Sequence, residues 1–278
     1  MFSSVLSLQL DNNFSSIVHG IEMGRTVFDN LKKVLLYLLP AGSFSEMLPV
    51  IANVFLGMPL PLSPFLMVVI CVLTDMGPAL ALVNEKPESQ IMTRSPRDVD
   101  HDRLVDGKLL FFAYLNIGMI QSFCAFLLYF LYLDDHGIPP SGVFLAFDKW
   151  RDGYYGRSQE ELDEMVYHAQ TVYFLALVIM QFGNLLSVRT RRISLFQQNP
   201  FYGPKRNLHI PIAMCVSALI AVLFTQIEWI NSQFHTRPVD AVYVLPALGF
   251  AAFIFLYDET RKYIVRKYPK SITAKLAW

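Results

Sequence analysis

Two carboxylic acids stand inside long apolar stretches of this 278-residue sequence. Glu46 lies in the apolar run that follows Lys33, and Asp75 lies in the next run along the chain. The segment GMPLPLSP at 57–64 separates the runs and is typical of a turn. If the runs fold back on each other there, both acids reach nearly the same depth, about 20 Å from the turn. Because an acid at that depth in a membrane is costly, it indicates a functional site.

Prolines lie close to both acids. Pro40 and Pro49 flank Glu46, and Pro78 follows Asp75. A proline inside a helix frees the carbonyl four residues earlier, and free carbonyls are tolerated at membrane depth only within protein or beside water. Oxygen donors of this kind suit a dehydrated cation. The predicted donors are the side chains of Glu46, Asp75, Ser43, Ser45 and Thr74 and the freed carbonyls of Leu36, Ser45 and Thr74.

A second interpretation of the same residues stays open. In it, both acids are neutral and are hydrogen-bonded within a helix bundle. The shared depth of Glu46 and Asp75 and the three neighbouring prolines favour the cation site.

Composition indicates that membrane helices position these acids. Hydrophobic residues make up 54% of the chain and charged residues 17%, whereas soluble domains carry about 25% charge. Apolar runs of about 20 residues can cross the lipid bilayer, so we predict an all-α, polytopic bundle of six transmembrane helices. The predicted spans are Phe28–Leu56, Leu62–Val83, Leu109–Leu133, Val166–Val188, Ile210–Ile230 and Val239–Tyr257.

The remaining polar residues narrow the function further. Lys and Arg lie in short clusters between the apolar runs, which argues against a nucleic-acid partner. The three cysteines lack the spacing of a disulfide framework or a zinc site, and we expect them to be small buried hydrophobes. They are Cys71, Cys124 and Cys215. Single amides inside spans usually hydrogen-bond between helices. The amides here are Asn116, Gln121, Gln181, Asn184 and Gln226.

The distribution of basic residues predicts the orientation. Nineteen of the 23 Lys and Arg residues lie before or at the start of the first span, after the second or fourth span, or in the C-terminal tail. The positive-inside rule therefore places both termini in the cytoplasm. The loop 134–165, with eight acids and three bases, is then on the outer side.

Several ordered strings carry a resemblance to a known family. They are VFDNLKK at 27–33, PLPL at 59–62, TDMGPALAL at 74–82, EKPESQIMTRSPR at 85–97, GMIQ at 118–121, RTRRISLFQQ at 189–198 and YDETRK at 257–262. Together they resemble the fifth to tenth membrane helices of P-type cation-transporting ATPases, closest to the sodium/potassium-transporting type. The similarity runs along nearly the whole chain.

The resemblance implies a function and a domain plan. Residues 1–27 would be a remnant of the phosphorylation domain and stalk, 28–257 the six-span transport domain, and 258–278 a basic cytoplasmic tail. The expected substrate is a monovalent cation and the expected location is the plasma membrane. Asn184 falls where the pumps usually carry a ligating Asp. In these pumps a beta-type subunit docks on the loop that corresponds to 134–165.

The sequence also departs from the pumps near the acids. Cys71 stands where the family usually has an Asp, and the stretch from Pro40 to Glu46 is one residue longer than its counterpart. The fifth span lacks a Glu that contributes to one sodium site. Sodium/potassium stoichiometry therefore does not carry over. Another ion, a proton-like role for Glu46 and lost transport all stay open.

The motifs for phosphorylation and nucleotide binding do not occur in this sequence. We therefore expect a fragment of a pump, whose missing N-terminal half would be its partner and would use Mg²⁺ and ATP. Whether the chain takes part in an enzyme stays open, and no cofactor is expected within it. The alternative is a standalone, non-catalytic polytopic protein that binds or regulates a pump.

Overall fold

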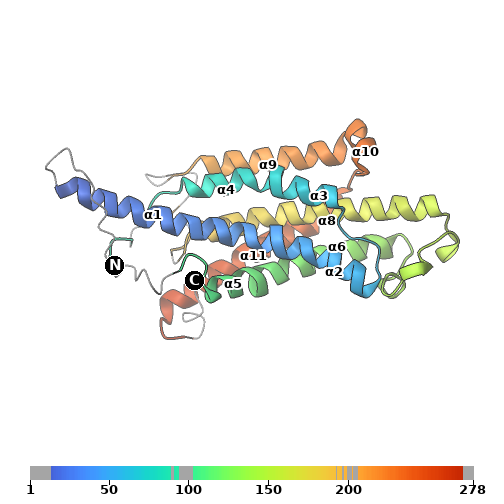
Figure 1. The fold of residues 1–278 in the computed structure, drawn as a ribbon, viewed down its shortest axis with the longest axis horizontal. Coiled ribbons are helices and arrows are strands. Elements are labelled where there is room, and N and C mark those ends of the chain that lie inside the picture. The colour runs from blue at the N-terminus through green and yellow to red at the C-terminus, as the bar shows by residue number, and fades with distance from the viewer. Residues whose placement is uncertain are drawn as a thin grey trace, which may run out of the picture.

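The computed structural model describes residues 14–88, 91–93, 103–191, 193–195, 197–198, 202 and 206–271. Residues 1–13 of the expected phosphorylation-domain remnant and residues 272–278 of the expected tail lie outside this range. Across the described residues the chain is helical and contains no strand. Six helical rods are long and apolar enough to cross a membrane, which confirms the predicted bundle. The first rod begins and the last rod ends at the same end of the bundle (Figure 1).

The first three rods are each built from consecutive helical pieces. The first comprises α1 (Phe14–Leu39), η1 (Pro40–Ser45) and α2 (Glu46–Leu56). The second comprises α3 (Pro64–Val68), η2 (Val69–Thr74) and α4 (Met76–Val83). The third comprises α5 (Gly107–Leu110), η3 (Phe111–Gly118) and α6 (Met119–Asp135). In each rod the η segment is a π-helical turn, a form that occurs mostly as a short insertion within α-helices.

The other three rods are single α-helices. They are α8 (Gln159–Val188), α9 (His209–Gln226) and α11 (Ala241–Lys267). Shorter helices lie in the connections: α7 (Pro140–Val143), η4 (Phe147–Lys149), η5 (Tyr154–Gly156) and α10 (Glu228–Phe234). Pro246 lies inside α11 without ending it.

Several helix ends differ from the predicted ones, and local contacts explain them. α9 ends at Gln226 because the backbone of Ile227 is extended, with φ −90° and ψ 113°, so the predicted span to Ile230 is too long. Helix α11 continues to Lys267, ten residues beyond Tyr257, the end of the predicted span. Lys262 holds this extension to the bundle, because its Nζ donates to the Ser187 carbonyl at 2.7 Å.

Helices extend into both ends of the predicted outer loop 134–165. α8 begins at Gln159, where Ser158 and Glu161 form a reciprocal capping box: Ser158 Oγ accepts from the Glu161 N–H, and the Glu161 carboxylate accepts from the Ser158 N–H. α6 continues to Asp135. The connection between α6 and α8, residues 136–158, is called the outer segment below.

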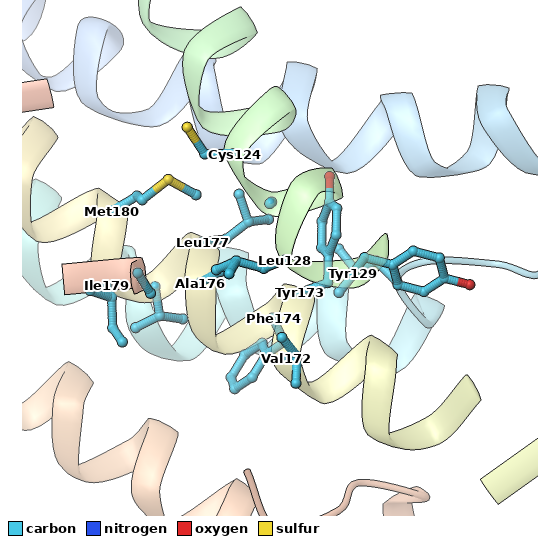
Figure 2. Close-up of a cluster of buried hydrophobic side chains, with 14 of the residues drawn as sticks. Cys124, Leu128, Tyr129, Val172, Tyr173, Phe174, Ala176, Leu177, Ile179 and Met180 are labelled. Carbon is cyan, nitrogen blue, oxygen red and sulfur yellow. The ribbon is translucent and has the colours of Figure 1, made fainter. Parts of the chain in front are cut away.

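Helix α8 is the centre of the bundle. In its most apolar stretch 83% of the residues are buried, against 28% in α9 and in α11. It contacts α1, α6, α9 and α11. Figure 2 shows side chains of α8 packed beside those of α6, and Tyr173 meets the ring of Phe126 edge-on at 5.3 Å between centroids. Side chains placed on α8 therefore reach most of the other rods.

Helices α8 and α11 pack closely against each other at Gly183. A Cβ atom added there would overlap the backbone carbonyl of Ala251, so only glycine permits this separation. Gly249 on α11 has no atom within 4 Å of the same added position.

We expect Gly183→Ala to lower the free energy of unfolding by about 1–3 kcal/mol, because α8 and α11 would have to separate. Gly249→Ala is the matched control and should leave stability unchanged or raise it slightly. Denaturant or thermal unfolding of the purified protein in detergent measures both. Equal stability of the two variants would contradict the close packing at Gly183.

Candidate functional site

Asp75 lies between η2 and α4 and is 2% exposed. The hydroxyl of Tyr37 on α1 donates to its Oδ1 at 3.0 Å, and Nε2 of Gln181 on α8 donates to its Oδ2 at 3.2 Å. Both partners are neutral, and both donate, which is the pattern that an ionised carboxylate requires. A buried charge held only by neutral donors favours the approach of a cation.

Two further amides orient Gln181. Its Oε1 accepts from Nε2 of Gln121 on α6 at 3.0 Å and from Nδ2 of Asn184 at 2.9 Å. With its own Oε1 occupied by donors, the amide group of Gln181 turns its Nε2 toward Asp75 and toward the Tyr37 carbonyl, 3.2 Å away. We call Tyr37, Asp75, Gln121, Gln181 and Asn184 the Asp75 network.

The Asp75 network contains unused acceptors. Oε1 of Gln121 and Oδ1 of Asn184 are buried and accept no hydrogen bond from the described residues. Both side chains are fully buried, and buried polar atoms in native proteins usually have partners. The network can therefore accept a further positive or donating group.

Glu46 is the first residue of α2 and is 8% exposed. The thiol of Cys71 lies 3.3 Å from each of its carboxylate oxygens and donates to them. Cys71 belongs to η2 and lies four residues before Asp75, so one helical segment contacts Glu46 and carries Asp75. The structure thus brings the two predicted acids to the same part of the bundle.

Cys71 differs from the sequence expectation of a buried hydrophobe. It is exposed, as is Cys215, and only Cys124 among the three cysteines is buried. Ser43, another predicted donor, is exposed as well. In the described part of the chain, the Glu46–Cys71 pair is therefore open on one side.

Two of the predicted freed carbonyls, those of Ser45 and Thr74, accept hydrogen bonds from side chains of other helices. The Ser45 carbonyl accepts from the Tyr173 hydroxyl at 3.0 Å, and the Thr74 carbonyl accepts from the Ser217 hydroxyl at 2.6 Å. The hydroxyls of Ser45 and Thr74 each donate to a carbonyl within their own rod. Proline thus frees these carbonyls as expected, and side chains of α8 and α9 then satisfy them. Each carbonyl keeps a second lone pair for another ligand.

Sequence reasoning missed part of the site. It described Gln121 and Gln181 only as single amides that bond between helices, and it gave Tyr37 no role. The spacing of Gln181 and Asn184, three residues apart on one helix, is the signal that they share a face. The spacing does not show that this face meets Tyr37 and Asp75.

A separate set of charged side chains forms ion pairs at the end of the bundle where α1 begins. Nε of the buried Arg189 donates to the buried Glu85 carboxylate at 3.0 Å, and Lys262 Nζ lies 2.9 Å from Asp258. From the sequence, Arg189 is expected in a loop and Lys262 in the C-terminal tail. Charges paired in this way are tolerated in the interior because neither is left uncompensated. Glu46 and Asp75 have no such partner among the described residues.

Comparison with known proteins identifies the family. Residues 59–264 match the family described as "Cation transporting ATPase, C-terminus". The chain therefore belongs to this family and corresponds to the C-terminal membrane part of a P-type ATPase. It is an integral membrane protein, and its described residues form six helices long and apolar enough to cross the bilayer.

Individual relatives agree with this assignment. The chain is 36% identical over 274 residues to "Sodium/potassium-transporting ATPase subunit alpha" of Hydra vulgaris, with 94% of this chain and 26% of the relative covered. It is 35% identical over 269 residues to the human alpha-4 subunit of the sodium/potassium-transporting ATPase, with coverages of 94% and 26%. It is 34% identical over 271 residues to "Potassium-transporting ATPase alpha chain 2" of the rabbit, Oryctolagus cuniculus, with coverages of 94% and 24%. The chain spans about a quarter of the length of the curated relatives it matches.

We expect Tyr37→Phe to lower the free energy of unfolding by about 1–3 kcal/mol, because a buried carboxylate loses a donor. The loss should be smaller when Asp75 is already Asn, so the two changes should couple in a double-mutant cycle. Tyr257→Phe, on the partly exposed surface of α11, is the control and should have little effect. Additive effects of Tyr37→Phe and Asp75→Asn on unfolding in detergent would argue against the hydrogen bond.

Proposed function

We propose that this chain is the cation-binding membrane domain of an ATP-driven pump for monovalent cations. The observation that carries the proposal is the buried carboxylate of Asp75, which accepts hydrogen bonds from two neutral side chains and has no basic partner among the described residues. A cation beside Asp75 and Glu46 supplies the missing positive charge. The buried acceptor oxygens of Gln121 and Asn184 add neutral ligands.

The donor set supports a monovalent cation. Within the described residues, no group of three or more His, Cys, Asp or Glu side chains could hold a metal ion. The site offers two acids together with neutral amide and backbone oxygens. Such a set suits a weakly held ion that must also leave again during transport. The relatives named above are called sodium/potassium-transporting and potassium-transporting, which agrees with this charge class.

The open side of the site supports a partner. Cys71 is exposed although it donates to the buried Glu46, so the described part of the chain does not enclose the cation completely. We infer that the N-terminal half of a pump covers this side and that its soluble domains bind ATP and Mg²⁺. The match to about a quarter of the length of full pump subunits is consistent with this division.

The proposed orientation places both termini in the cytoplasm and the outer segment on the opposite side of a plasma membrane. Two observations support it. Most Lys and Arg residues lie in the segments on the same side of the spans as the termini, and α1 begins at the end of the bundle where α11 ends (Figure 1). The outer segment is then accessible to a beta-type subunit. The family resemblance is the support for that partner.

Neutralising either acid tests the function. In a chimera in which this chain replaces the matching quarter of a sodium/potassium pump alpha subunit, Glu46→Gln and Asp75→Asn should each raise the cation concentration for half-maximal ATPase activity about tenfold or more, because a charged ligand is lost. Asn184→Ala should have a smaller effect, because the lost ligand is neutral. Glu228→Gln, an exposed acid on α10, is the control.

Unchanged cation dependence in both acid variants would show that these acids are structural. A chimera that never responds to cations would instead favour a non-catalytic protein that binds or regulates a pump.

Cysteine labelling tests the orientation. Ser141 in α7 is exposed, so Ser141→Cys in intact cells should react with a membrane-impermeant thiol reagent added outside. Gly20→Cys, near the start of α1 where no atom lies within 4 Å, should react only after the cells are opened. The parent protein sets the background from its own cysteines. The reverse pattern would overturn the proposed topology.

A further inference from the structure

The turn between α2 and α3 is held by hydrogen bonds from other parts of the chain. Five consecutive carbonyls, those of residues 56–60, each accept one. In order along the turn, the donors are the Leu145 N–H, the Phe147 N–H, Asn53 Nδ2, the Tyr129 hydroxyl and Gln170 Nε2. The first two bonds, at 2.7 and 2.8 Å, come from the backbone of the outer segment.

The turn has few means to hold itself. Two of its residues, Pro59 and Pro61, and the first residue of α3, Pro64, have no N–H to donate. Gly57 ends α2 in the left-handed conformation, with φ 58°, and so directs the chain away from the helix axis. The position of the turn therefore depends on the donors that reach it from the outer segment, α6 and α8.

The outer segment contacts the turn in a strained conformation. Leu145 and Phe147 have φ values of 56° and 30°, which bulky residues rarely adopt. The ring of Phe147 covers Gly57 so closely that an added Cβ would lie 2.5 Å from it. Backbone strain of this kind persists only where the surrounding contacts determine it, and here those contacts are with the turn.

The same turn sets the position of both acids. α2, 11 residues long, leads from Glu46 to the turn, and α3 and η2, of five and six residues, lead from the turn to Asp75. Each acid is thus about 16 Å along a helical arm from the turn. Because close-packed interiors transmit strain, a shift of the turn displaces both arms.

Helix α8 provides the fixed frame for these arms. Its Gln170 donates to the Leu60 carbonyl in the turn, and its Gln181, three helical turns further on, donates to Asp75. Helix α8 therefore holds the second rod at Asp75 and also holds the turn that precedes this rod. The first rod is held at its turn by the two amides of the outer segment.

We propose that residues 145–147, here called the clamp, position Glu46 and Asp75 for cation binding by holding the turn between α2 and α3. This proposal rests on the proposed function, because the clamp would act on the cation affinity of the site at Glu46 and Asp75. Leu145 and Phe147 are positioning residues, since they contact the turn and not the cation. Both side chains are 59% exposed, so the clamp can be reached from outside the bundle.

Replacing Phe147 by proline releases the clamp, because proline removes the N–H and cannot adopt a positive φ. Phe144→Pro is the matched control: its φ of −69° suits proline, and its N–H bonds within the outer segment, to the Pro140 carbonyl. Phe147→Tyr keeps the ring and the N–H and should behave like the parent protein.

Hydrogen exchange and cation dependence are the two readouts. Phe147→Pro should speed amide exchange about tenfold along α2 and at the start of α3, since bonds that hold the turn are lost. In the chimera it should raise the half-maximal cation concentration about three- to tenfold. Coupling between two sites acts in both directions. In the chimera without further substitution, saturating cation should therefore slow hydrogen exchange of the Leu145 and Phe147 amides. This last measurement needs no variant and so does not depend on one folding.

Faster exchange confined to residues 144–149, or a cation dependence equal to that of the parent, would overturn the proposal. If the chimera without further substitution shows no cation dependence, the proposed function fails. The hydrogen-exchange comparison of Phe147→Pro with the unsubstituted protein then tests the clamp by itself. Spread of the faster exchange into α2 would support its positioning role, and confinement to the outer segment would refute it.

Discussion

The buried carboxylate of Asp75 is the group on which the arrangement of the central helices depends. A carboxylate at this depth needs donors, and they come from α1 through Tyr37 and from α8 through Gln181. Gln181 can serve because Gln121 on α6 and Asn184 occupy its carbonyl oxygen. The network therefore links four rods through one acid. Helix α8 carries two of these amides, and its buried position between the other rods lets them reach Asp75.

The partners of buried charged groups differ along the length of the bundle. At the end where α1 begins, buried acids are paired with bases, as in Glu85 with Arg189. At the opposite end the turn exposes five carbonyls to donors and carries no charge of its own. Between the two ends, Asp75 and Glu46 meet only neutral groups among the described residues. A mobile cation is the partner that completes this distribution, and it can leave because no fixed base replaces it.

Much of this architecture follows from simple patterns in the sequence. Apolar runs predict the six rods, and the position of the acids relative to the turn predicts that they meet at one depth. The freed carbonyls of Ser45 and Thr74 follow from the prolines. The Asp75 network does not, because the rotation of α1, α6 and α8 about their axes depends on packing across helices. For the same reason the exposure of Cys71 was not predictable from its apolar neighbours. The helix past Tyr257 depends on the contact of Lys262 with the end of α8.

Direct location of the ion tests the central claim, that Asp75 and Glu46 with the neighbouring amides bind a monovalent cation. Thallous ion is a monovalent cation that scatters X-rays anomalously, so crystals of the chimera grown with it should show an anomalous peak. The account predicts this peak within ligand distance of the Asp75 carboxylate, with oxygens of Glu46, Gln121 or Asn184 completing its surroundings. A peak should be absent in crystals of the Asp75→Asn protein. Thallium bound elsewhere in the membrane domain, with the Asp75 network unoccupied and its hydrogen bonds intact, would contradict the account.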